Sequence, residues 1–234
     1  MRAPALATSA PSLQDAALVR LVIGNKNYSS WSLRPWLLLE HFAIPFEEVR
    51  IPLYQPGSRE EILRHSPSGH VPVLIDGETV VWDSLAICEY AAEMPAARGA
   101  WPADRVARAR ARSIAAEMHS GFTALRHTMQ MNVRARGRRV PVTADVADDV
   151  TRIQSIWASC RASAASDGAW LFGAFTIADA MFAPVAFRFQ TYGVACEGLA
   201  ASYLHTLLEH PAMQRWAADA ADEREVIASS EVGQ

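Results

Sequence analysis

The stretch NYSSWSLRPW (27–36) joins an apolar, strand-like run to an amphipathic, helix-like run and places three serine hydroxyls at the junction. Pro35 falls in the first turn of the expected helix, where its missing N–H costs nothing, and Ser32 stands where a cap is needed. The free N–H groups and the positive dipole end of a helix start attract anions. We therefore expect an anion site here. A plain cap by Ser30 or Ser32 is the simpler interpretation, but it leaves Ser29 without a role.

Composition limits the class of protein. The chain has 234 residues, of which 50% are hydrophobic and 20% charged, which is enough for one or two domains with cores. A formal charge of -3 gives no reason to expect nucleic acid or an acidic membrane surface as the main partner. No apolar run approaches a membrane span, and the first residues lack the apolar core of a signal peptide. We expect a cytoplasmic protein that binds neither nucleic acid nor membrane.

Cysteines and histidines give no sign of a metal centre. Cys88, Cys160 and Cys196 lie far apart and form no CxxC pair, so neither a disulfide framework nor a zinc site is expected. The 7 histidines are equally scattered. We therefore expect no bound metal.

The first half of the chain carries both strand and helix signals. Residues 1–17 are rich in Ala, Ser and Pro without periodicity, which predicts a flexible tail. Strands are predicted at 20–23, 46–51, 71–75 and 79–82, the last two flanking the hairpin signal Asp76-Gly77-Glu78, and helices at 33–42 and 83–93. The predicted order is β-α-β-loop-β-β-α.

Strand signals end at the breaker cluster Gly99-Ala100-Trp101-Pro102, which indicates a domain boundary. Helices are predicted beyond it at 104–135, 144–165, 176–190, 200–208 and 211–220. Thr176 and Asp179 have the spacing of a capping box at the third of these helices. The sequence thus predicts a mixed α/β domain followed by an all-helical one.

Three motifs in this order resemble those of the cytosolic glutathione transferases over about residues 19–220. SSWSLR (29–34) is similar to Ser-Ser-Cys-Ser-x-Arg of the serine-type zeta class, SPSGHVPVL (66–74) to Asn-Pro-x-x-x-Val-Pro-x-Leu, and DSLAI (83–87) to Glu/Asp-Ser-x-Ala-Ile. The resemblance implies a thioredoxin-like glutathione-binding domain at 18–95, an all-helical C-terminal domain at 104–226, and a homodimer formed through the first long helix of the latter.

The resemblance also implies how glutathione, as co-substrate, would bind. A cis peptide at Val71-Pro72 would expose the backbone of Val71 for antiparallel pairing with the cysteinyl unit. Asp83 and Ser84 would meet the γ-glutamyl end, although both also suit a plain N-cap. His70, and His41 at the end of the first helix, would contact the glycyl carboxylate or simply lie at the surface.

Ser29 would be the catalytic residue, with Ser30 as a supporting donor. A thiol like that of free cysteine has a pKa of about 8.5, so ionising it near neutrality needs about 3 kcal/mol. A hydrogen bond to the charged sulfur supplies about 1.5–3 kcal/mol and the helix dipole about 0.3–1 kcal/mol. Without an adjacent base, Ser29 is not expected to be an acylating nucleophile. Tyr28 is a rival donor on the same turn.

Two departures from the zeta pattern bear on the reaction. Trp31 stands where that class has Cys, and Trp36 where it has a second Arg, which favours detoxifying conjugation over isomerisation or disulfide reduction. Trp31, Met118 and Phe122 are expected to wall a pocket for a small hydrophobic electrophile, although each also suits a core. Further candidates by position are His119, Met129, Met131 and Asn132.

Other activities fit the same motifs. A maleylacetoacetate-type cis-trans isomerase would require arginines in the pocket for an acidic substrate, and a glutathione-dependent peroxidase or dehalogenase would share every site residue. A non-enzymatic binding protein would keep the fold alone. The arginines at 105, 108, 110, 112, 134, 136, 138 and 139 are expected on solvated faces or against acids of a second subunit.

Overall fold

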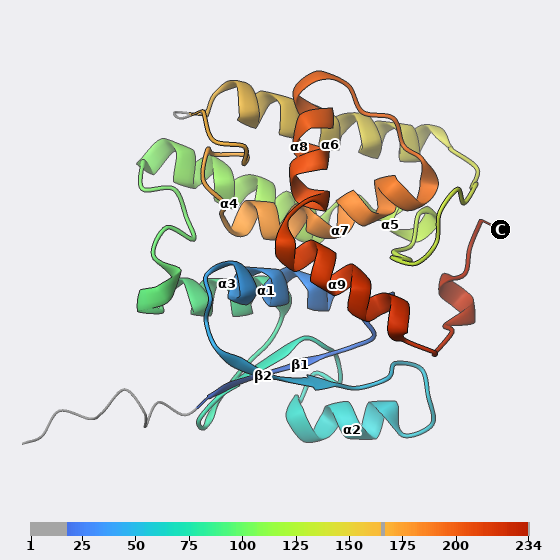
Figure 1. The fold of residues 1–234 in the computed structure, drawn as a ribbon. Coiled ribbons are helices and arrows are strands. Elements are labelled where there is room, and N and C mark those ends of the chain that lie inside the picture. The colour runs from blue at the N-terminus through green and yellow to red at the C-terminus, as the bar shows by residue number, and fades with distance from the viewer. Residues whose placement is uncertain (1–17, 165–166, 234) are drawn as a thin grey trace, which may run out of the picture.

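The N-terminal half is built on one small sheet. The computed structural model describes residues 18–164 and 167–233, so the predicted tail at 1–17 lies outside the described residues. Four strands lie in the order β2-β1-β3-β4 (Figure 1). β1 runs parallel to β2 and antiparallel to β3, which pairs antiparallel with β4. The strands are β1 (Val19–Ile23), β2 (Phe46–Arg50), β3 (Val73–Asp76) and β4 (Thr79–Val81).

Helices cover both faces of this sheet. α1 (Ser30–His41) and α3 (Ser84–Ala92) lie on one face and α2 (Ser58–His65) on the other (Figure 1). Side chains of β1 alternate accordingly, because Leu21 and Ile23 join the main core whereas Val22 packs with Ile62 of α2. Burial on both faces explains why residues 21–23 of this strand form a continuous apolar run.

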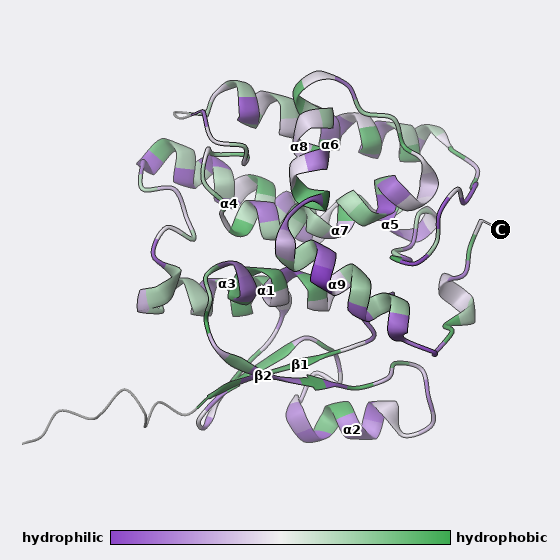
Figure 2. Cartoon of the chain, in the orientation of Figure 1, coloured by the Kyte–Doolittle hydropathy of each residue, from purple (hydrophilic) through white to green (hydrophobic). Residues whose placement is uncertain are grey.

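The helix α2 corrects the predicted loop between the second and third strands. Its eight residues, SREEILRH, contain one buried residue, Ile62, and no amphipathic repeat, and Figure 2 shows it as largely hydrophilic. Glu60 and Glu61 in the first turn and Arg64 and His65 in the last suit the helix dipole. A single apolar contact with the sheet is too weak a pattern to be read from the sequence.

The rest of the described chain is helical and confirms the predicted class. Its helices are α4 (Arg105–Ser120), α5 (Thr123–Thr128), α6 (Ala144–Ala162), α7 (Ile177–Tyr192), α8 (Gly198–Leu208) and α9 (Pro211–Asp222), with short 3-10 turns at Pro95–Ala97 and Ala228–Ser230. The predicted single helix at 104–135 is wrong in extent. Gly121 ends α4, Phe122 adopts a left-handed conformation (φ 55), and only the short α5 follows.

α7 is the centre of the helical half. It is buried along almost its whole length and packs against α1 and α4. The predicted capping box is confirmed, since Asp179 accepts from the backbone N–H and the hydroxyl of Thr176 at 2.7 and 2.9 Å. Asp179 also accepts from Leu171 N and from the Tyr203 hydroxyl, so one buried carboxylate ties α7 to α8 and to the preceding turn.

Most of the basic run is engaged within the chain rather than free on a solvated face. Arg108 donates to two carbonyls, Arg110 to two serines of α6, and Arg112 pairs with Glu89 of α3. Arg138 pairs with Glu231. Among the described residues, no helix is long and apolar enough to cross a membrane, and no group of three metal-binding side chains occurs.

A histidine pair joins the end of α1 to the start of α9. Nδ1 of His210 accepts from Ala212 N at 3.1 Å and caps α9, so its Nε2 carries the proton and donates to Nδ1 of His41, 2.9 Å away. The His41 ring stacks on Phe175 at 4.0 Å. Burial, followed by the charges of His41 and Arg215, lowers the pKa of His210 to about 4. A second proton on the His210 ring would also remove the acceptor that caps α9.

From the His41–His210 pair we predict that the folded protein loses stability as the pH falls. Folding lowers the pKa of His210 from 6.5 to about 4, so in that interval the unfolded chain binds the proton more tightly and stability falls as pH falls. His210→Asn keeps a cap acceptor without the titration and is expected to flatten urea-unfolding free energies between about pH 7 and 4. The exposed His205→Asn is the control. Equal slopes in the His210→Asn and wild-type proteins would contradict the assignment.

Candidate active site

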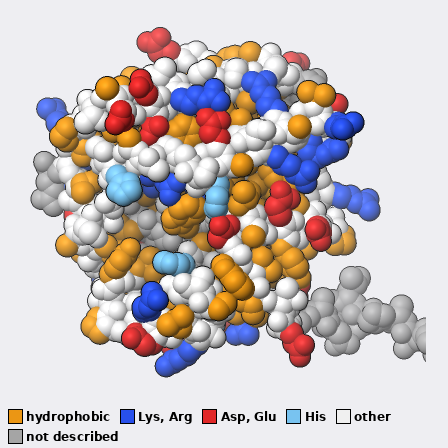
Figure 3. Space-filling view, turned by 180° about the vertical axis from the view of Figure 1, so that it is seen from behind, with side chains coloured by type: hydrophobic (Ala, Val, Ile, Leu, Met, Phe, Trp, Pro, Cys, Tyr) orange, Lys and Arg blue, Asp and Glu red, His pale blue; other side chains and the backbone are white. Residues whose placement is uncertain are grey.

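A cavity of about 680 Å³ lies between the sheet and the helical half. Figure 3 shows a hollow on the face turned away from α9, with histidine and basic side chains around an apolar floor. Its walls come from the β1–α1 turn, α2 and the loop before it, residues 69–71, α5 and the loop after it, α7, and the C-terminal segment. The site is therefore made by segments that are distant in the sequence.

The serine turn forms one wall, and its three hydroxyls differ in their contacts. Ser29 caps α1: its Oγ accepts from Ser32 N at 3.4 Å and donates to Ser32 Oγ at 2.7 Å. Ser32 Oγ in turn accepts from Gly24 N at 3.1 Å. Ser30, the first residue of α1, is only half-buried and lines the cavity, and no hydrogen bond among the described residues uses its hydroxyl. Ser30 therefore presents the free hydroxyl at the helix start.

Tyr28 lines the same wall, but its hydroxyl is turned to the C-terminal segment. It donates to Glu231 at 2.6 Å and accepts from Arg134 at 3.0 Å. Burial, and then the bond to Glu231, raises the pKa of the Tyr28 phenol. The rival donor is thus engaged elsewhere.

The opposite wall carries the proline motif. The Val71–Pro72 peptide is cis, which confirms the prediction. Val71 and the exposed His70 line the cavity directly before β3. No hydrogen bond among the described residues uses the backbone N–H or C=O of Val71. The backbone of Val71 can therefore pair with an extended ligand.

Asp83 and Ser84 begin α3 and do not line the cavity. Asp83 caps the helix through Leu85 N and Ala86 N, and its other oxygen lies 3.0 Å from Nε2 of His119. The Ser84 hydroxyl is fully buried and has no partner among the described residues. His119, on α4, packs edge-on against Trp31 with ring centroids 5.3 Å apart.

Three further predicted site residues, His41, Met118 and Phe122, lie away from the cavity. His41 belongs to the aromatic cluster at the far end of α1, and Met118 and Phe122 are buried in the main core. Of the other candidates by position, Met131 lines the cavity, whereas Met129 and Asn132 are buried beside it. Trp31 does line the cavity, together with residues of α5, α7 and the loop after α5: Thr123, Arg126, His127, Gln130 and Arg188. The helical wall is thus polar and basic.

The sequence reasoning missed Arg126 and Arg188. Arg188 stands in the otherwise apolar run MFAPVAFRF (181–189), and a charge inside a buried helix was the available signal. Burial lowers its pKa to about 10, and Arg34, beneath Trp31, has its pKa lowered to about 9 by burial and by the charges of Arg126 and Arg188. The Trp31 ring lies 4.4 Å from the Arg34 guanidinium and 4.7 Å from that of Arg126.

Comparison with known proteins agrees with this arrangement. Residues 28–94 match the family model of the glutathione S-transferase N-terminal domain. The N-terminal half is therefore similar to such a domain. A dichloromethane dehalogenase from Methylorubrum extorquens is 37% identical over 60 residues, which are 25% of this chain and 21% of the dehalogenase. The match thus spans about a fifth of that relative.

Solved structures extend the likeness to the helical half. A glutathione transferase homolog from Burkholderia, solved with bound glutathione, is 23% identical with a TM-score of 0.63, covering 88% of this chain and 98% of its own. A maleyl pyruvate isomerase, described as a bacterial zeta-class glutathione S-transferase, is 22% identical with a TM-score of 0.65, covering 88% and 100%. The chain has the glutathione transferase fold. The predicted thioredoxin-like domain followed by helices is confirmed.

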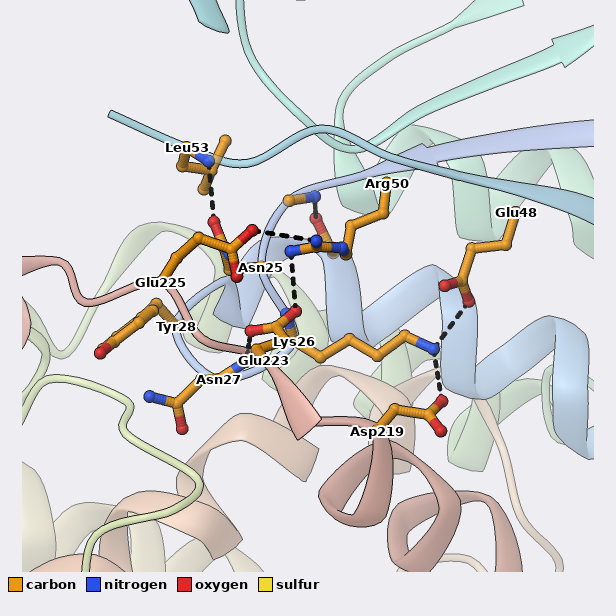
Figure 4. Close-up of polar contacts among 12 residues, drawn as sticks. Asn25, Lys26, Asn27, Tyr28, Glu48, Arg50, Leu53, Asp219, Glu223 and Glu225 are labelled. Atoms are coloured by element: carbon orange, nitrogen blue, oxygen red, sulfur yellow. Dashed lines mark hydrogen bonds and ion pairs between the residues drawn. The ribbon is translucent and has the colours of Figure 1, made fainter. Parts of the chain in front are cut away.

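In this glutathione transferase fold, the turn before the serines is held by the C-terminal segment (Figure 4). The Glu223 carboxylate accepts from Lys26 N at 2.6 Å and Asn27 N at 3.1 Å. Lys26 Nζ lies 2.8 Å from Glu48 and 2.6 Å from Asp219 of α9. Two buried N–H groups of the turn thus depend on one distant carboxylate.

This dependence predicts a large effect of Glu223→Ala. Leaving two buried N–H groups unpaired is expected to lower the free energy of unfolding by about 2–4 kcal/mol, and Glu223→Gln by less, because its amide oxygen still accepts. Glu225→Ala, which removes one partly exposed ion pair with Arg50, is the control, with an expected loss below about 1 kcal/mol. Urea unfolding measures all three variants. Equal losses at 223 and 225 would contradict the dependence.

Proposed function

We propose that this protein is a glutathione transferase that holds the thiolate of glutathione at the start of α1. The proposal rests mainly on one observation: the free Ser30 hydroxyl and the unpaired backbone of Val71 line the same cavity. Glutathione paired with Val71 along its cysteinyl unit would bring its sulfur to the helix start. The Burkholderia homolog, which has the same fold, was solved with bound glutathione, which supports glutathione as the ligand.

Thiol activation requires no base in this proposal. The thiol proton passes to water, and the Ser30 hydroxyl donates to the resulting thiolate while the first N–H groups of α1 add the helix dipole. The thiolate then forms a bond to an electrophilic carbon of the second substrate, from which a leaving group departs with its electron pair. Together these donors supply about 2–4 kcal/mol, enough to bring a thiol pKa of about 8.5 to near 6.

The contacts of the two serines revise the sequence-based assignment. Ser29 was expected to touch the sulfur, but its hydroxyl is donated to Ser32 and its oxygen caps α1. We assign the sulfur contact to Ser30 and give Ser29 a positioning role in the turn.

The remaining glutathione contacts are assigned from the positions of three side chains. His70 is exposed at the cavity and suits the glycyl carboxylate. The unpaired, buried Ser84 hydroxyl supports a contact with the γ-glutamyl end beside Asp83. No observation supports such a contact for His41. A homodimer and a cytoplasmic location stay predictions.

Ultraviolet difference absorbance of bound glutathione against pH tests the sulfur contact. Wild-type protein is expected to show thiolate near neutral pH, and Ser30→Ala to raise the thiol pKa by about 1–2 units, the worth of one charge-assisted hydrogen bond. Ser29→Ala should raise it less but cost about 1 kcal/mol of stability through the lost cap. Ser202→Ala, on an exposed turn of α8, is the control.

Two outcomes would contradict the proposal. A thiolate signal unaffected by Ser30→Ala but lost in Ser29→Ala would return the sulfur contact to Ser29. No detectable glutathione binding by wild-type protein would remove the enzymatic function altogether.

A further inference from the structure

Three arginines gather beside the cavity without an acidic partner. Arg34 and Arg188 are 2% and 5% exposed, and Arg126 is partly buried. Among the described residues none of the three lies within 4.0 Å of a carboxylate. Nε and Nη1 of Arg34 have no hydrogen-bond partner in the part of the chain that the structure describes. The structure thus buries a cluster of uncompensated positive charge.

Groups within the chain do not neutralise this cluster. Arg188 donates to the Met129 carbonyl, and Arg126 donates to the carbonyls of His119 and Gly121 at 3.2 and 3.1 Å. Carbonyls satisfy N–H groups but carry no net charge. Asp83, whose charge acts against the lowering of the Arg34 pKa, already caps α3 and pairs with His119.

Such an arrangement is costly unless an anion completes it. An unpaired charge taken out of water costs several kcal/mol, and like charges close together add to that cost. Arg126 adds such a like-charge repulsion to both neighbours, since its charge helps to lower the pKa of Arg34 and of Arg188. Of the three, Arg126 and Arg188 line the cavity, where an anion from solution can reach them.

We propose that Arg126 and Arg188 bind a carboxylate of the second substrate, so that this protein prefers an anionic electrophile to the purely hydrophobic one expected from the sequence. Guanidinium forks match a carboxylate in geometry as well as charge. Trp31, whose ring centroid is 4.7 Å from the Arg126 guanidinium, lines the same cavity next to Ser30. The role of this anion site in catalysis rests on the proposed transferase function.

The first experiment compares two chloronitrobenzenes that react alike. The thiolate of glutathione bonds to the ring carbon that carries chlorine, chloride leaves, and the thiol proton goes to the buffer. The neutral probe is 1-chloro-2,4-dinitrobenzene and the anionic probe is 4-chloro-3,5-dinitrobenzoate. Arg126→Gln and Arg188→Gln are compared with Arg105→Gln, which removes an equal charge at an exposed residue of α4.

The ratio of kcat/KM for the anionic probe to that for the neutral probe is expected to fall 10- to 100-fold in Arg126→Gln and to stay unchanged in Arg105→Gln. An unchanged ratio in Arg126→Gln would overturn the proposal. A raised KM for glutathione with both probes would also overturn it, because the arginines would then hold a carboxylate of glutathione instead. If the Arg188→Gln protein does not fold, because Arg188 is only 5% exposed, the comparison of Arg126→Gln with Arg105→Gln is sufficient for the test.

A second measurement needs no catalysis. Isothermal titration calorimetry with benzoate alone, without glutathione, is expected to show binding to the wild-type and Arg105→Gln proteins and at least 10-fold weaker binding to Arg126→Gln. Equal affinity of the wild-type and Arg126→Gln proteins for benzoate would overturn the anion site. If glutathione fails to form a thiolate but benzoate binding still depends on Arg126, the anion site stands and the proposed transferase function falls.

Discussion

The double burial of α1 is the constraint on which the rest of the structure depends. Eight of its 12 residues are buried, because the helix lies between the sheet and α7. A helix that is buried on all sides needs packing partners on all sides, and neither half of the chain provides them alone. Joining the halves across α1 places its N-terminus, the positive end of its dipole, at the edge of the cavity between them.

This constraint also explains the chemistry of the cavity. Trp31 and Arg34 share the first turns of α1, so the packing that buries α1 also buries a guanidinium beneath an indole ring. α7 brings Arg188 to the same place from the other side. A site with a hydroxyl donor, a helix dipole and two accessible guanidinium groups suits a thiolate and a second anion together.

The site is further fixed by the end of the chain. Glu223 and Glu231 fold back onto the serine turn, the first through backbone N–H groups and the second through the Tyr28 hydroxyl. Turns that carry reactive groups are held by distant contacts of this kind, since a short loop cannot satisfy its own buried donors. The engagement of Tyr28 in that network leaves Ser30 as the free hydroxyl of the turn.

The sequence by itself determined the local features: the strand at β1, the helix start after the serines and the capping box at Asp179. These depend on residues within a few positions of one another, whose preferences survive in any fold. Only the tertiary structure decided that the Ser29 hydroxyl is used in the cap while that of Ser30 stays free at the cavity, and that Met118 lies in the core while Arg126 and Arg188 line the wall. Arg126 and Arg188 are 62 positions apart in the sequence and can share a function only because packing brings them together. No local sequence pattern predicts a contact between residues so far apart.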